Sequence, residues 1–117
     1  MGSGGGASST GTSGASGGGA VRLIVGGALS VDGAIRANGN DTGSAGSIWI
    51  NAATVAGAGP IEANGGTTTS NGGGGRIAIY TGGSTHTGAI TAYEGNDAGA
   101  GSGTIYTEIG ASKTLLF

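Results

Sequence analysis

Short runs in which apolar and polar residues alternate recur along the chain. Four of them correspond when they are aligned on their first large aliphatic residue, which is Val21, Ile48, Ile77 or Ile105. Their separations are 27, 29 and 28 residues (48−21, 77−48 and 105−77). Alternation rich in β-branched residues is the signature of a strand with one buried face. The pattern therefore predicts one such strand per repeat, with a period of about 28 residues.

A second series keeps the same period. It is centred on Ile35, Ile61 and Ile90, whose separations are 26 and 29 residues (61−35 and 90−61). Two independent motifs in one register establish an internal repeat. Each repeat is thus expected to hold two short strands, and the two aliphatic series should form two separate inward-facing ladders.

Glycine-rich arcs follow the second strand of each repeat, at residues 38–46, 64–75 and 94–103. Glycine accounts for 31 of the 117 residues, far more than in ordinary domains, while proline occurs once and in no collagen-like period. The net charge of −2 and the aliphatic clusters argue against a wholly disordered chain. Glycine serves either tight corners or close backbone packing in such arcs; flexible surface loops are the alternative.

These observations predict an all-β fold, a parallel β-solenoid or β-helix of about four coils with roughly 28 residues per coil and glycine-rich arcs. Stacked coils lie about 4.8 Å apart and bury one another's apolar faces. The length fits a single domain. We expect a glycine- and serine-rich arc over 1–19, followed by repeats over 20–46, 47–75 and 76–103 and a partial repeat over 104–117.

Three segments carry a resemblance to a known family: Gly-Ser-Ile-Trp-Ile at 46–50, Gly-Pro-Ile-Glu-Ala-Asn-Gly-Gly at 59–66, and Gly-Gly-Gly-Gly-Arg-Ile-Ala-Ile-Tyr at 72–80. From Ala20 onward the chain resembles the glycine-rich β-helical repeats of large bacterial secreted and cell-surface proteins. The resemblance implies a parallel β-helix in an extracellular or cell-surface setting. We expect a structural or adhesive module of such a protein or fibre. A glycan- or receptor-binding module of the adhesin type is the alternative.

Composition removes several function classes. The chain has no cysteine, which excludes disulfides and thiolate metal sites. Its four lysines and arginines give no electrostatic footprint for nucleic acid. No window approaches the roughly 20 apolar residues of a membrane span. Neither nucleic acid nor membrane insertion is therefore expected.

The carboxylates do not form a catalytic group in the aligned repeats. A polysaccharide-cleaving β-helix needs acids grouped on one face with a basic partner. The acids here are Asp32, Asp41, Glu62, Glu94, Asp97 and Glu108. We expect no catalytic residue and no cofactor, and His86 reads as a solvated side chain.

Calcium is the cation that the arcs suit best, since Asp41 and Asp97 occupy matching positions after Gly-Asn. The middle arc offers threonines at 67–69 instead, which interrupts the ladder. Two solvated Asx turns are therefore expected, and no metal site.

Two aromatic residues, Trp49 and Tyr106, fall at equivalent positions that alternate with the buried aliphatics. Arg22 and Ala78 complete that row. Exposed aromatics on one face suit sugar binding or self-association. We expect instead that glycine-rich arcs cover them as a second packed layer, with an exposed binding surface as the alternative.

The chain ends on Leu115, Leu116 and Phe117, without a charged or proline-containing stop. Uncapped repeat stacks leave strand edges open to another chain. We expect these three residues at a stacking junction with a further copy or with the neighbouring repeats of a longer protein. The alternative is that Phe117 folds back as a plug. The same alignment places Arg36 and Glu62 side by side on the outside, as an ion pair.

Overall fold

The computed structural model describes residues 2, 4, 14–67, 72–95 and 101–117, and in these it contains β-strands and no helix. The strands are β1 (Ala20–Ser30), β2 (Ile35–Arg36), β3 (Ser47–Ala56), β4 (Ile61–Glu62), β5 (Arg76–Ser84), β6 (Ile90–Thr91), β7 (Thr104–Ile109) and β8 (Ser112–Leu116). Long strands alternate with two-residue strands from β1 to β7. The predicted all-β class is confirmed.

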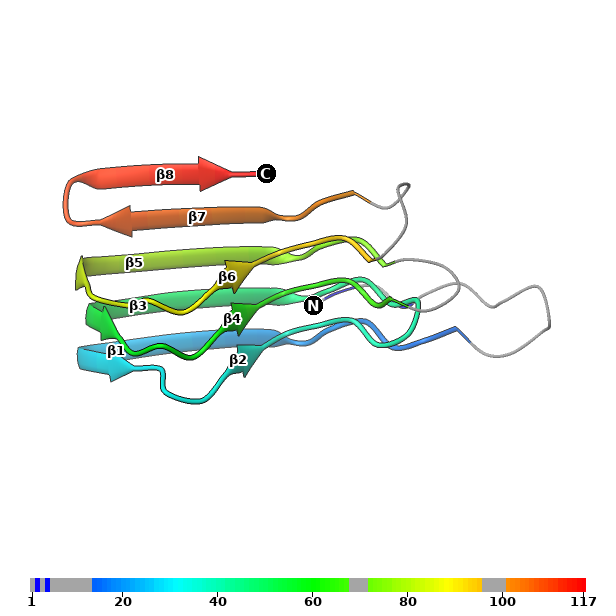
Figure 1. Ribbon diagram of the computed structural model, residues 1–117, viewed down its shortest axis with the longest axis horizontal. Coiled ribbons are helices and arrows are strands. Elements are labelled where there is room, and N and C mark those ends of the chain that lie inside the picture. Colours follow the sequence, from blue (N-terminus) through cyan, green and yellow to red (C-terminus); the bar gives the residue numbers. More distant parts are fainter. Residues whose placement is uncertain (1, 3, 5–13, 68–71, 96–100) are drawn as a thin grey trace.

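The strands form two sheets, ordered β1-β3-β5-β7-β8 and β2-β4-β6 (Figure 1). The chain moves from a long strand to a short one and back, so that each sheet receives every second strand as far as β7. Every pairing is parallel except that between β7 and β8. The fold is therefore mainly parallel, as the repeat predicts.

Both predicted ladders are in register. Val21 is paired with Ile48, Ile48 with Ile77, and Ile77 with Ile105. In the smaller sheet, Ile35 is paired with Ile61 and Ile61 with Ile90. The period read from the sequence thus equals one step across each sheet, although it varies by a few residues between repeats. The length of the arcs absorbs most of that variation, and an irregularity between Val25 and Ala28 of β1 absorbs one residue.

The core lies between the two sheets. Ile48, Ile50 and Ile77 of the larger sheet are 1%, 0% and 2% exposed, and Ile61 of the smaller sheet is 0% exposed. Each such side chain contributes about 1.5–3 kcal/mol relative to an exposed position. The equivalent residues of the end strands, such as Val21 and Ile105, are only partly buried against this cluster. Burial is therefore deepest in the middle repeats.

Backbone hydrogen bonds join the glycine-rich arcs in two directions. Along the stack, the Ala45 amide donates to the Gly73 carbonyl at 2.9 Å. Within one repeat, the Gly46 amide donates to the Ala37 carbonyl at 2.7 Å. The next two repeats make the latter bond at equivalent positions, Gly75 to Ala63 and Gly103 to Ala92. The described parts of the arcs are therefore hydrogen-bonded structure, and the flexible-loop alternative does not apply to them.

Close approach explains why these positions are glycine. A Cβ added to Gly46, Gly75 or Gly103 would overlap the backbone of the preceding repeat. Among the described glycines, only Gly57 (φ 104°) and Gly110 (φ 56°) have a positive φ. Of the two expected functions of glycine, packing of backbone against backbone dominates over tight corners.

The last repeat departs from the prediction. A partial coil over 104–117 was expected to run on toward a second short strand. Instead the chain turns at Gly110 and β8 runs antiparallel along β7, with Ile105 opposite Leu116. Gly110 and Ala111 form a two-residue loop, and its first residue has the positive φ that tight hairpins require. The larger sheet is therefore mixed, and the prediction of a wholly parallel structure is wrong for this end.

Candidate functional site

The outer face of the larger sheet carries the predicted aromatic row. Arg22, Trp49, Ala78 and Tyr106 are paired across β1, β3, β5 and β7. Their chain neighbours in the aliphatic ladder face the core, so alternation turns this row outward. The predicted equivalence of Trp49 and Tyr106 is confirmed.

Tyr80 adds a third aromatic side chain to this face, in the neighbouring outward row where it pairs with Asn51 and Glu108, and the sequence did not predict it. It lies two residues after Ala78 in β5, on the same face, and its ring centroid is 5.7 Å from those of both Trp49 and Tyr106. The interplanar angles are 46° and 50°, which are tilted arrangements that aromatic pairs favour. We call Trp49, Tyr80 and Tyr106 the aromatic strip. The alternation Arg76 to Tyr80 was the signal that could have revealed the third member.

Polar groups flank the aromatic strip at both ends. The Arg22 guanidinium carbon lies 5.0 Å from the centroid of Trp49, within the range of a cation–π contact. At the other end, the Tyr106 hydroxyl donates to Glu108 Oε2 at 3.2 Å. Desolvation is the largest cause that raises the pKa of the Tyr106 hydroxyl above its usual value of 10.0, and the hydrogen bond to Glu108 raises it further. The strip thus combines apolar ring faces with a cation, a carboxylate and hydroxyl groups.

All three rings of the strip are half-buried. The expectation that arcs cover them does not hold for the described arcs, which continue beyond the ends of the long strands (Figure 1). Half-exposed aromatic rings with polar neighbours suit contact with a ligand that has both apolar and polar faces.

The three C-terminal residues are exposed, at 52% for Leu115, 56% for Leu116 and 86% for Phe117. Leu115 pairs with Tyr106 and so lies on the outer face, while Leu116 pairs with Ile105 on the inner face. Phe117 fills no core position, which is contrary to the plug alternative. Leu116 and Phe117 border the C-terminal hollow, a space of about 260 Å³. It is lined by Ile90, Ala92, Tyr93, Ser102, Gly103, Ile105, Leu116 and Phe117.

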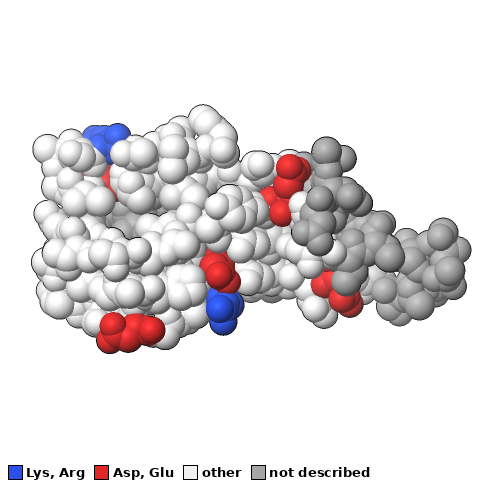
Figure 2. Space-filling model, viewed as in Figure 1, with Lys and Arg blue, Asp and Glu red and all other residues white. Residues whose placement is uncertain are grey.

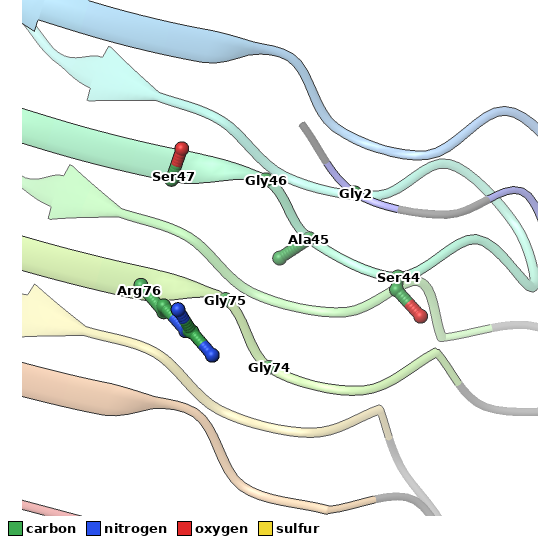
Figure 3. Close-up of a pocket in the computed structure, with 8 residues that line it drawn as sticks. All are labelled: Gly2, Ser44, Ala45, Gly46, Ser47, Gly74, Gly75 and Arg76. Atoms are coloured by element: carbon green, nitrogen blue, oxygen red, sulfur yellow. The ribbon is translucent and has the colours of Figure 1, made fainter.

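A second hollow, of about 340 Å³, lies where two arcs enter β3 and β5 (Figure 3). Glycine backbone from Gly2, Gly46, Gly74 and Gly75 forms much of its lining. Figure 3 shows Ser47 and Arg76 at the starts of the two strands, and Arg76 is exposed. A single exposed cation beside backbone does not make a defined binding site.

Asparagines form a short ladder beside a third hollow. The backbone N–H of Asn64 donates to the side-chain Oδ1 of Asn38 at 2.8 Å, and the backbone N–H of Tyr93 donates to the side-chain Oδ1 of Asn64 at 2.9 Å. Asp41 lines this hollow with a φ of 46°, whereas its proposed partner Asp97 lies outside the described residues. No three His, Cys, Asp or Glu side chains of the described chain gather as metal ligands. The asparagines therefore align the repeats and are not evidence of a cation site.

His86 differs from the expectation of a solvated side chain. It is half-buried, and its Nε2 donates to the Gly59 carbonyl at 2.8 Å. Because a carbonyl only accepts, the bond requires a proton on Nε2. His86 thus tethers the loop after β5 to the preceding repeat.

Charged side chains occur singly or in small groups on the face shown in Figure 2, with no patch of one sign. Within the described ranges, no helix has the length and apolar character of a membrane span. The aromatic strip and the C-terminal hollow are the two surfaces whose composition stands out.

Comparisons with known proteins do not indicate what these two surfaces bind, so their function is inferred from their geometry. A scan against protein-family models, a search of curated proteins and a search of solved structures each found no match to the chain.

Proposed function

We propose that the chain is a non-catalytic structural or adhesive module, a parallel β-solenoid of about four turns, in an extracellular or cell-surface protein or fibre. The observation that supports this most strongly is the register. Equivalent residues of successive repeats pair in both sheets, from Val21 through Ile105 and from Ile35 through Ile90. The module needs no cofactor, and its partners are neighbouring repeats of a longer protein or further copies of itself.

Stacked repeats suit a structural function because their stability grows with each interface between neighbours. The glycine arcs extend the stacking beyond the strands, since their backbones bond from one repeat to the next. Buried aliphatics and backbone hydrogen bonds hold such a stack together without a ligand. A protein or fibre gains length by adding repeats of this kind.

Duplication of one repeat tests the architecture on which this function rests. A second copy of residues 47–75 would be inserted between Gly75 and Arg76, so that each new junction reproduces the native Gly46–Ser47 or Gly75–Arg76 step. We expect the melting temperature to rise by several degrees, because one repeat interface is added. The control carries the same insert with aspartate at the copies of Ile48 and Ile61 and should melt below the parent. A duplicated chain that melts no higher than this control would overturn the proposal.

Glycan or receptor binding is the second candidate, and the aromatic strip is the observation that favours it. A glycan screen of the wild-type chain would reveal ligands whose binding is lost in Trp49→Ala and Tyr80→Ala. Tyr93→Ala is the matched control, since Tyr93 is 65% exposed and lies outside the strip. Binding that survives both strip substitutions would exclude this surface as the site.

A further inference from the structure

The two sheets end at different levels at the C-terminal end of the stack. The smaller sheet ends at β6, while the larger sheet continues past β5 with β7 and β8. Figure 1 shows this overhang of two strands above the end of the smaller sheet. The end therefore has the shape of a step, with the C-terminal hollow in its corner.

The overhang presents an apolar inner face. Ile105 and Leu116 are paired on that face, and both line the C-terminal hollow together with Ile90 of β6. Leu116 is 56% exposed and Phe117 86%. None of the side chains that line the hollow is charged. This corner thus exposes residues of the kind that the middle repeats bury.

Among the described residues, no strand pairs with β6 on the side away from β4. The Ile61 amide donates to the Ala89 carbonyl, and the Ala63 amide to the Thr91 carbonyl, both at 2.9 Å. The alternation of a parallel ladder turns the N–H and C=O groups of Ile90 away from β4, toward the step. The Thr91 hydroxyl is buried without a partner in the described part of the chain. The strand is therefore ready to accept another strand along its edge.

We propose that this step binds the same step of a second copy, giving a closed two-fold dimer. A two-fold axis parallel to the strands places the overhang of each copy against the end of the smaller sheet of the other copy. The partner's β8 then lies along β6 in the same direction, because β6 and β8 point the same way in Figure 1. The rotation keeps positions along the strands, so the partner's Leu116 end meets Ile90.

Self-complementarity selects a second copy as the occupant. A step that is two strands high fits an inverted step of equal height, and an isologous contact uses one surface twice. No charged side chain lines the hollow, so two identical faces bring no like-charged side chains together. Each copy then covers the open β6 edge and the exposed Leu116 of the other, which closes both ends of the contact and stops growth at two chains.

This interlock deepens the stacking function proposed above and rests on it, and sedimentation of the full chain tests it. We expect a monomer–dimer equilibrium in the wild type. Leu116→Lys places a charge in the corner and should weaken dimerisation by at least about 100-fold. The matched control is Leu115→Lys, the neighbouring residue with a similar exposure of 52% on the outer face, which should dimerise as the wild type does.

Other outcomes overturn the interlock. A wild type that stays monomeric at high concentration, or that forms assemblies larger than dimers, contradicts the closed two-fold contact. Equal effects of the two lysine substitutions contradict the assignment of the inner face. Circular dichroism of each variant verifies folding, and substitution of Phe117 by Lys gives a second probe of the same corner. A monomer that is nonetheless stabilised by repeat duplication would overturn the dimer and leave the structural function standing.

Discussion

Arg36 and Glu62 lie opposite each other on neighbouring strands of the smaller sheet and form an ion pair, with Arg36 Nε donating to Glu62 Oε2 at 2.7 Å. The repeat alignment predicted this pair across 26 residues, and the structure confirms it. The two side chains are 59% and 22% exposed, and a pair at such a surface contributes only about 0–1 kcal/mol. The pair therefore reports the register of β2 and β4 and contributes little stability.

The pH dependence of Glu62 follows from this pair. The hydrogen bond from Arg36 is the largest cause that lowers the pKa of the Glu62 carboxyl below 4.5. A lowered folded-state pKa stabilises the fold above the unfolded pKa, and that contribution is lost as the pH falls through the folded pKa. Glu62→Gln should therefore reduce the free energy of unfolding by at most about 1 kcal/mol at pH 7, with a smaller difference near pH 3. Urea denaturation at both pH values measures this, and a constant difference would contradict it.

The inward ladder predicts a large contrast between two isoleucines. Ile77 is 2% exposed in the centre of the stack, while Ile24 is 67% exposed on β1. Ile77→Asp should unfold the chain, because burying an unpaired charge costs several kcal/mol or more. Ile24→Asp is the control and should fold with little loss of stability. Circular dichroism and thermal melting decide the matter; a folded Ile77→Asp chain would exclude the assigned register.

Close packing of the arcs predicts a contrast between two glycines. A Cβ on Gly46 would overlap the Gly19 carbonyl, whereas a Cβ on Gly33 has nothing within 4 Å. Gly46→Ala should cost about 1–3 kcal/mol or more from overpacking. Gly33→Ala should be neutral or stabilising by up to about 1 kcal/mol, since alanine restricts the unfolded chain. Equal melting temperatures for the two variants would show that the arcs do not pack as described.

Much of the fold could be predicted because parallel stacking converts one sequence period into one register. Side chains alternate with a period of two residues, so a slip of one residue would turn Ile48 and Ile77 to the outside. Burial therefore fixes the pairing wherever large aliphatics recur. The same logic gave the ion pair of Arg36 with Glu62, which needs no information beyond the alignment.

The rest lacked a periodic signal. The arcs are held by backbone hydrogen bonds, and glycine carries no side chain whose pattern would report them. The β7–β8 hairpin depends on a local turn at Gly110, a two-residue signal that the long-range repeat obscured. Tyr80 was missed because only the outward row of Trp49 and Tyr106 was aligned, and Tyr80 lies in the next outward row. The β7–β8 hairpin forms part of the C-terminal hollow, so the hollow could not be predicted without predicting the hairpin.

Nuclear magnetic resonance of a methyl-labelled sample tests the central claim, that both ladders stack in one register in one molecule, most directly. The account predicts nuclear Overhauser contacts between the Ile48 and Ile77 methyl groups and between those of Ile61 and Ile90, since paired residues lie one strand spacing of about 4.8 Å apart. Contacts of Ile61 with a residue two positions from Ile90 in place of Ile90 itself, or a folded chain that shows only one of the two contacts, would contradict it.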